Sequence, residues 1–258
     1  MEYRGAMKAP QHGYSAKFQE HATAEQYERF YQQGKADEAM WRIERDFLDD
    51  LLRRDGRDWL RCSYLDFACG TGRVIAFLES RVGESRGIDI SPEMLQIAAG
   101  KVRRSDLLHV DITACETPES TYDLVTAFRF FLNAEPSLRR AVMKALALRL
   151  KNRRSLLVFT NHGNPLSYKA VLWPYHQLRR RGGKQPVVGN YMTHWQVMEL
   201  VERAGLELVE HHGYGFVSPK LFRLAPAMSW QVERWSAFQP VLNRFGVNHI
   251  YVARLAST

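Results

Sequence analysis

The stretch that decides the fold runs from residue 65 to residue 73 and reads Leu-Asp-Phe-Ala-Cys-Gly-Thr-Gly-Arg. It begins as a short apolar run, as in buried strands, and continues into a helical pattern. The glycines at 70 and 72 permit a tight turn and leave bare backbone for a ligand to approach. Amide groups at the start of the following helix add hydrogen-bond donors and a positive dipole end. We therefore expect a ligand carboxylate or phosphate at this turn.

A second acid supports a ligand site at the same place. Asp89 follows Asp66 by 23 residues and ends the next predicted strand, before Ser91 and Pro92. An acid about 20 residues beyond a glycine-rich turn is placed to accept hydrogen bonds from ribose hydroxyls. Ser91 as N-cap and Pro92 as the first helical residue hold this acid at a rigid corner. A third acid, Asp111, ends the following strand and is by itself also typical of a plain loop aspartate.

Strands and helices alternate along most of the chain. Apolar runs predict strands at residues 64–69, 85–90, 107–112, 122–128, 155–161, 206–214 and 247–255. Helical spacing predicts helices at residues 23–55 (interrupted near Gly34), 72–82, 92–103, 137–151 and 193–204. Because the strands are continuously apolar rather than alternating, they indicate a parallel sheet covered on both faces. An α/β doubly wound fold is therefore expected.

The chain is long for one hydrophobic core, so we expect a single domain with insertions. Within this single domain, 1–258, we expect a helical cap at residues 1–58 and a cofactor-binding core at 59–161. Two insertions, at residues 162–192 and 215–246, are expected on the substrate side. Within the second insertion, Trp230, Trp235 and Phe238 stand at near-helical spacing. We expect this stretch to pack against the rest of the protein.

Composition excludes several protein classes. With 45% hydrophobic and 25% charged residues, the chain is neither disordered nor fibrous. Three cysteines are too few for a disulfide framework or a zinc knuckle. No apolar run approaches the roughly 18 residues that span a bilayer, and the N-terminus lacks the apolar core of a signal peptide, so we expect a cytoplasmic protein. The net charge of +8 suits nucleic acid, an anionic membrane face or a phosphorylated small molecule.

Residues 65–73, 87–94, 110–112 and 122–128 together resemble the class I S-adenosylmethionine-dependent methyltransferases, of the bacterial small-molecule type. The resemblance implies a Rossmann-like sheet of seven strands, mostly parallel, with residues 247–255 antiparallel beside the fifth strand. It also implies S-adenosyl-L-methionine as cofactor, S-adenosyl-L-homocysteine as product, and no metal. A nicotinamide cofactor is less favoured, because Ile75 occupies the place of the third glycine in the dinucleotide fingerprint.

The same resemblance assigns cofactor contacts. The turn at 66–72 would hold the methionine part of the cofactor and Asp89 the ribose. Ile90 and Met94 would flank the adenine, and Asp111 with Ile112 would meet its amino edge. The complete set implied for the cofactor is Tyr31, Asp66, Ala68, Cys69, Gly70, Gly72, Asp89, Ile90, Met94, Asp111, Ile112, Ala127 and Phe128.

Transfer of a sulfonium methyl group needs alignment more than covalent catalysis, and positioning alone can supply roughly 7–11 kcal/mol. If the acceptor is a hydroxyl or a protonated amine, a general base helps. His162, after the fifth strand, is the candidate base, although a histidine there is also typical of a structural loop. The candidate substrate-binding residues, for an acceptor that could be anionic, are Arg129, Asn133, Tyr191 and Tyr214.

Three functional hypotheses follow. The first is methyl transfer to a small molecule, with oxygen as the favoured acceptor atom, because the insertions would enclose a pocket. The second is methyl transfer to RNA, DNA or protein, favoured by the basic charge and by the run at residues 179–184, which is also typical of a solvated loop. The residues 127–130 after the fourth strand lack the Asn/Asp-Pro-Pro-aromatic pattern of DNA amino-methyltransferases. The third hypothesis is a cofactor-binding or scaffold protein without turnover.

Overall fold

The computed structural model describes residues 36–114, 120–164, 167, 192–237, 239 and 241–257 of the chain. Tyr31, Tyr191, Phe238 and the basic run at 179–184 lie outside the described residues. Among the helices that are described, none is long and apolar enough to cross a membrane.

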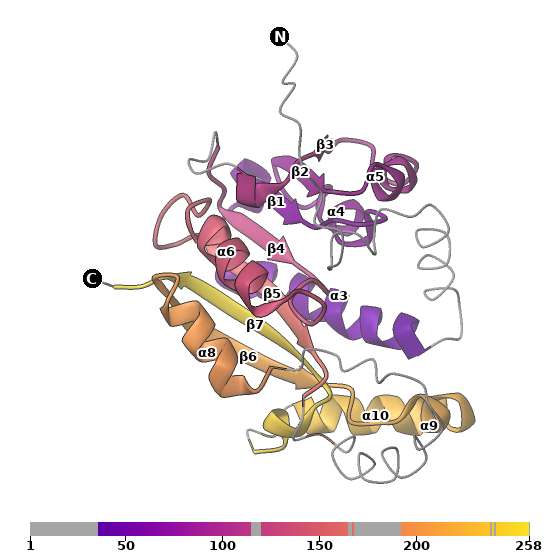
Figure 1. Cartoon of the computed structure of the whole chain (residues 1–258). Helices are drawn as coiled ribbons and strands as arrows, with labels where there is room; N and C mark the ends of the chain where they lie inside the picture. The colour runs from indigo at the N-terminus through magenta and orange to yellow at the C-terminus, as the bar shows by residue number, and fades with distance from the viewer. Residues whose placement is uncertain are drawn as a thin grey trace, which may run out of the picture.

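One sheet of seven strands organises the described part of the chain (Figure 1). Its strands are β1 (Ser63–Phe67), β2 (Glu84–Asp89), β3 (Asp106–His109), β4 (Leu124–Ala127), β5 (Leu156–His162), β6 (Leu206–Tyr214) and β7 (Asn248–Leu255). The order is β3-β2-β1-β4-β5-β7-β6, with β1 to β5 parallel and β7 antiparallel to both β5 and β6. The predicted Rossmann-like sheet, including the antiparallel strand beside β5, is confirmed.

Helices cover both faces of this sheet. They are α3 (Ala36–Asp55), α4 (Arg73–Leu78), α5 (Pro92–Ala99), α6 (Pro136–Ala147), α8 (His194–Glu202), α9 (Pro219–Leu224) and α10 (Pro226–Ala237), with the short 3-10 helices η1 (Trp59–Arg61), η2 (Ile112–Ala114) and η3 (Leu242–Phe245). One hydrophobic cluster contains the buried side chains of α6 and α8, and a second contains those of α3 and α4. Two clusters separated by a sheet are what the doubly wound prediction requires.

Local sequence signals set the helix boundaries. The Ser91 hydroxyl accepts a hydrogen bond from the Met94 amide, and Pro92 begins α5, as predicted. Thr193 and Gln196 form a capping box at the start of α8. Gly205, with φ +76°, follows α8 in the left-handed conformation that favours glycine after a helix.

The second insertion packs on the protein as expected, with Val217 and Phe222 in the hydrophobic cluster of α3 and α4, but its two described tryptophans differ. Trp230 packs edge-on against Phe222, with ring centroids 6.1 Å apart. Trp235, on the same helix, is 60% exposed. Trp230 and Trp235 are five residues apart, about 140° around a helix with 3.6 residues per turn, so one can pack inward while the other faces solvent.

Candidate active site

A glycine bend connects β1 to α4 at the carboxyl edge of the sheet. Ala68 has φ +52°, and Gly70 and Gly72 have φ +54° and +80°. A Cβ atom on Gly72 would lie 2.8 Å from the Ala98 Cβ atom, closer than real Cβ contacts allow. The backbone conformation and the close approach of α5 therefore both require glycine at position 72.

Replacing Gly72 by alanine tests this requirement. The left-handed conformation costs a non-glycine residue about 1–2 kcal/mol, and overpacking against Ala98 adds about 1–3 kcal/mol. We expect Gly72→Ala to lower the free energy of unfolding in urea by roughly 3 kcal/mol. Gly205→Ala is the matched control, because Gly205 has φ +76° but nothing within 4 Å of its added Cβ. Equal losses in the two variants would contradict the close packing at Gly72.

Asp89 joins the bend to the start of α5. Its Oδ2 accepts a hydrogen bond from the Gly70 amide at 2.8 Å, and its Oδ1 accepts one from the Ser91 amide at 2.9 Å. Burial raises the pKa of the Asp89 carboxyl above its usual value, and the two amides oppose this shift. Each carboxylate oxygen retains a further lone pair. Asp89 can therefore accept hydrogen bonds from ligand hydroxyls without leaving its place.

Asp66 lies beneath the same bend and is almost completely buried. It accepts hydrogen bonds from the Ile75 amide at 3.1 Å and from the Thr126 hydroxyl at 2.6 Å. Burial, opposed by these hydrogen bonds, raises the pKa of Asp66 to about 7. Since both carboxylate oxygens contact protein donors, Asp66 fixes the first turn of α4 against β4.

A small cavity, of about 40 Å³, lies at the glycine bend. It is lined by Glu44, Asp66, Ala68, Cys69, Gly70, Thr71, Arg73, Val74, Phe128 and Arg129. Among the described residues the buried Thr71 hydroxyl has no hydrogen-bond partner. A buried polar atom without a partner is costly unless a ligand or water satisfies it. The Thr71 hydroxyl is therefore available to form a hydrogen bond with a ligand beside the bend.

The other residues predicted to meet the cofactor lie at the carboxyl ends of β2, β3 and β4. Met94, Ile112 and Ala127 are buried, and Ile90 is half-buried. Asp111 accepts hydrogen bonds from the Thr113 amide and hydroxyl, at 2.9 Å and 2.7 Å. Asp111 thus closes a local turn, as in the plain loop interpretation of this residue.

A buried polar cluster lies beside the cavity. Glu44 on α3 is 1% exposed and accepts a hydrogen bond from the Tyr214 hydroxyl at 2.5 Å. The same Glu44 Oε1 lies 3.2 Å from Arg129 Nη2 and 3.6 Å from His162 Nε2. His162 Nε2 in turn lies 3.5 Å from the Tyr214 hydroxyl. Glu44 therefore joins three side chains that follow or end β4, β5 and β6; we call these four residues the Glu44 cluster.

Electrostatics favour a charged Glu44. Burial alone would raise the pKa of this carboxyl, but the Arg129 guanidinium, His162 and the Tyr214 hydroxyl together lower it to about 2. The Arg129 backbone is held at φ +59°, and its amide donates to the Thr160 hydroxyl at 2.8 Å. A bulky residue in the left-handed region is strained, and such strain concentrates at functional sites.

The structure brings together some, but not all, of the residues predicted for catalysis and substrate binding. Arg129, His162 and Tyr214 belong to the Glu44 cluster, so the structure brings them together. Asn133 is exposed and its side-chain amide donates to the Arg129 carbonyl at 3.1 Å, which places it at the rim. Tyr214 is fully buried, and its hydroxyl contacts Glu44 rather than solvent.

Comparison with known proteins identifies a domain within the chain. Residues 65–153 match the model of a methyltransferase domain family. These residues therefore form a methyltransferase domain. No curated protein matched the chain.

Solved structures share the fold at low sequence identity. Magnesium protoporphyrin IX methyltransferase from Synechocystis, with bound S-adenosylhomocysteine, is 16% identical with a TM-score of 0.62, covering 94% of this chain and 97% of that one. The same enzyme with bound S-adenosylmethionine is 13% identical with a TM-score of 0.64, covering 97% and 100%. An S-adenosylmethionine-dependent methyltransferase from Clostridium acetobutylicum is 14% identical with a TM-score of 0.60, covering 91% and 100%.

Glu44 is the residue that sequence analysis missed. A signal for it was present, because this acid falls on the apolar stripe of α3 that includes Phe47 and Leu48. A carboxylate on the core-facing side of a helix needs a buried partner. The sequence indicates that such a partner exists, but it does not say which residues provide it.

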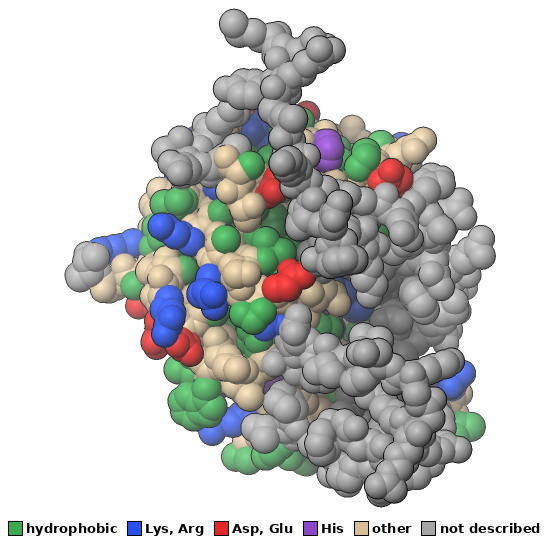
Figure 2. Space-filling model, viewed as in Figure 1, with side chains coloured by type: hydrophobic (Ala, Val, Ile, Leu, Met, Phe, Trp, Pro, Cys, Tyr) green, Lys and Arg blue, Asp and Glu red, His purple; other side chains and the backbone are tan. Residues whose placement is uncertain are grey.

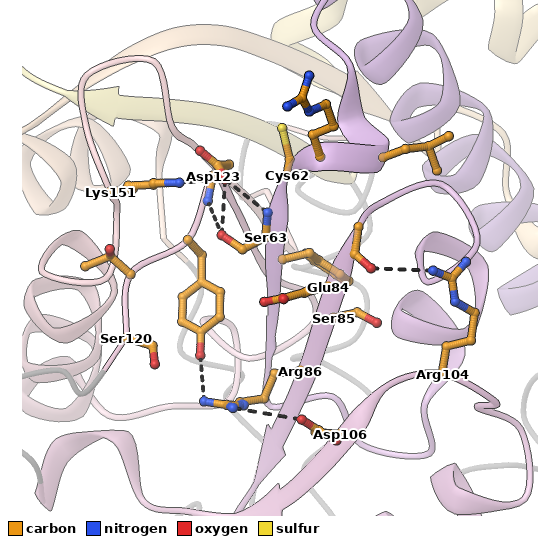
Figure 3. Close-up of a pocket in the computed structure, with 16 residues that line it drawn as sticks. Cys62, Ser63, Glu84, Ser85, Arg86, Arg104, Asp106, Ser120, Asp123 and Lys151 are labelled. Atoms are coloured by element: carbon orange, nitrogen blue, oxygen red, sulfur yellow. Dashed lines mark hydrogen bonds and ion pairs between the residues drawn. The ribbon is translucent and has the colours of Figure 1, made fainter.

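A second cavity, of about 880 Å³, opens at the opposite, amino-terminal ends of β1 to β5 (Figure 3). Its charged side chains largely interact with one another or with the backbone. Lys151 lies 3.5 Å from Asp123, and Arg86 lies 3.9 Å from Asp106. Arg104 donates to the Gly83 carbonyl at 3.5 Å. We assign no role to this cavity, because ligands of doubly wound sheets bind at the carboxyl ends of the strands.

Proposed function

We propose that this protein transfers a methyl group from S-adenosyl-L-methionine to a small-molecule acceptor, with oxygen as the favoured acceptor atom. The observation that carries the proposal is the pairing of the strained glycine bend with Asp89, next to a buried cluster of ionisable side chains. The donor set fits the cofactor. Bare amides and the Thr71 hydroxyl suit its amino-acid part, and the Asp89 carboxylate suits the ribose hydroxyls.

The cofactor, when bound, supplies a methyl group already activated on a sulfonium. The protein then has to align the acceptor and receive a proton. His162 would take the proton from the acceptor hydroxyl, and the Glu44 carboxylate at 3.6 Å would stabilise the resulting imidazolium. Arg129 at the cavity wall would attract an anionic acceptor while remaining paired with Glu44. No step in this scheme uses a metal.

Loss of the Asp89 carboxylate tests cofactor binding. We expect Asp89→Ala to weaken the binding of S-adenosylhomocysteine by roughly 1–3 kcal/mol, about 5- to 150-fold in Kd, the range for hydrogen bonds to a charged group. Isothermal titration calorimetry measures the change. Asp106→Ala is the matched control, because Asp106 begins β3 at the other edge of the sheet. Unchanged affinity in Asp89→Ala would refute the assignment of the ribose site.

RNA or protein is the second candidate acceptor, favoured by the net charge of +8. Figure 2 shows basic side chains scattered over the face of α6 and α8, among apolar and neutral ones, rather than gathered in one patch. This distribution favours the small-molecule proposal on that face. Labelled-cofactor assays at increasing salt separate the two, because binding to nucleic acid weakens steeply as salt rises.

A further inference from the structure

Helix α10 buries three polar side chains against the protein and exposes three large apolar ones to solvent. Ser229, Glu233 and Ser236 are 0%, 2% and 4% exposed. Met228 and Val232, by contrast, are 51% and 40% exposed. Soluble proteins normally place helices the other way round.

Specific contacts fix this orientation. The Glu233 carboxylate accepts hydrogen bonds from the Gly215 amide at 2.9 Å and the Val217 amide at 2.7 Å. These hydrogen bonds satisfy two backbone N–H groups of the turn that follows β6. Because a buried carboxylate with two such bonds is costly to expose, the helix cannot rotate to bury its apolar side.

The exposed apolar side chains extend over α9, α10 and η3. We call this surface the outer face; it lies at the end of the molecule beside the ends of β6 and β7 (Figure 1). Its members are Leu221 (41% exposed), Leu224 (83%), Met228 (51%), Val232 (40%), Trp235 (60%), Val241 (71%) and Phe245 (45%). Because α9 and η3 both contact α10, these side chains lie on neighbouring elements, and exposed apolar side chains gathered in this way are typical of an interaction surface.

Among the described residues from 215 to 246, every exposed charged side chain is positive. Arg223, Arg234 and Arg244 are exposed, and none of them pairs with a carboxylate among the described residues. Glu233 is the single acid in the sequence from 215 to 246, and it is buried. The outer face therefore combines exposed leucine, methionine and tryptophan with uncompensated arginine.

We propose that the outer face binds the surface of an anionic lipid bilayer. Interfacial helices insert apolar and tryptophan side chains at the headgroup boundary, and neighbouring basic residues attract anionic lipid. A second copy of the chain is a less suitable partner for the outer face than an anionic bilayer. A twofold contact would bring the arginines of both copies together with no carboxylate to compensate them. The proposal is independent of the methyl acceptor.

Vesicle flotation of the full chain tests the proposal. We expect the protein to float with phosphatidylcholine vesicles that contain phosphatidylglycerol and to remain unbound with phosphatidylcholine alone. The double variant Leu224→Glu with Trp235→Glu should bind at least tenfold more weakly, because both apolar side chains lose their burial. Trp195→Glu is the matched control, since Trp195 is 73% exposed on α8, outside the outer face, and should bind like the wild type.

A second variant isolates the charge contribution. Arg223→Gln with Arg234→Gln should weaken binding about fivefold or more for each arginine removed. Circular dichroism confirms that each variant is folded. Failure of the wild type to bind anionic vesicles, or an equal loss in Trp195→Glu, would overturn the proposal. So would a concentration-dependent dimer that Leu224→Glu with Trp235→Glu abolishes without any vesicle binding, because the outer face would then belong to a second copy.

Discussion

Replacing Glu44 by glutamine is expected to lower the free energy of unfolding by about 3–5 kcal/mol, the usual cost of removing one partner from a buried ion pair. The Glu44 carboxylate is 1% exposed and lies 3.2 Å from Arg129 Nη2, so its loss removes a buried anion that faces this cation. Urea denaturation at neutral pH measures the change. Asp50→Asn, in an exposed pair on the same helix, is the matched control and should change stability by less than about 1 kcal/mol.

The contribution of the Glu44 carboxylate to the free energy of unfolding depends on pH in a definite direction. The folded-state pKa of Glu44 is about 2, below the usual value of 4.5. The stabilisation is therefore fully present above pH 4.5 and is lost as the pH falls toward 2. The difference in stability between wild type and Glu44→Gln should shrink over this acid range. A difference that stays constant from pH 7 to pH 3 would mean that the carboxylate charge is not responsible.

Replacing His162 by alanine is expected to reduce kcat about 10²- to 10⁴-fold, the usual contribution of a general base, while the affinity for S-adenosylhomocysteine stays unchanged. The imidazole lies 3.5 Å from the Tyr214 hydroxyl and 3.6 Å from Glu44, outside the glycine bend. Its loss should therefore affect proton transfer without removing a cofactor contact.

Two further measurements separate a base from a structural residue. Added imidazole should restore part of the activity of His162→Ala if the side chain acts by accepting a proton. Tyr214→Phe keeps the ring but removes the hydroxyl bonded to Glu44, so it reports on the packing of the cluster without removing the base. Unaltered turnover in His162→Ala, with a well-folded variant, would exclude His162 from catalysis.

The fold was predictable because its signals are local. The strand β5 is buried at every residue, and its continuous apolar run is visible in the sequence. Gly72 and Asp89 follow a spacing that reflects one crossover between adjacent strands. The Glu44 cluster was only partly predictable, because its members come from α3 and from the ends of three strands. These side chains come together only because of the order of the strands in the sheet, and that order cannot be inferred from a short stretch of sequence.

Helix α3 has a consequence for how the protein can be divided. It precedes the first strand and lies outside the matched stretch 65–153, yet it supplies the carboxylate that neutralises Arg129. A fragment that begins at β1 would remove this carboxylate from beside the Arg129 guanidinium and the His162 imidazole. The apolar side chains of α3 also pack in the hydrophobic cluster shared with α4, so trimming the chain to residues 65–153 would remove a part of the protein's own core.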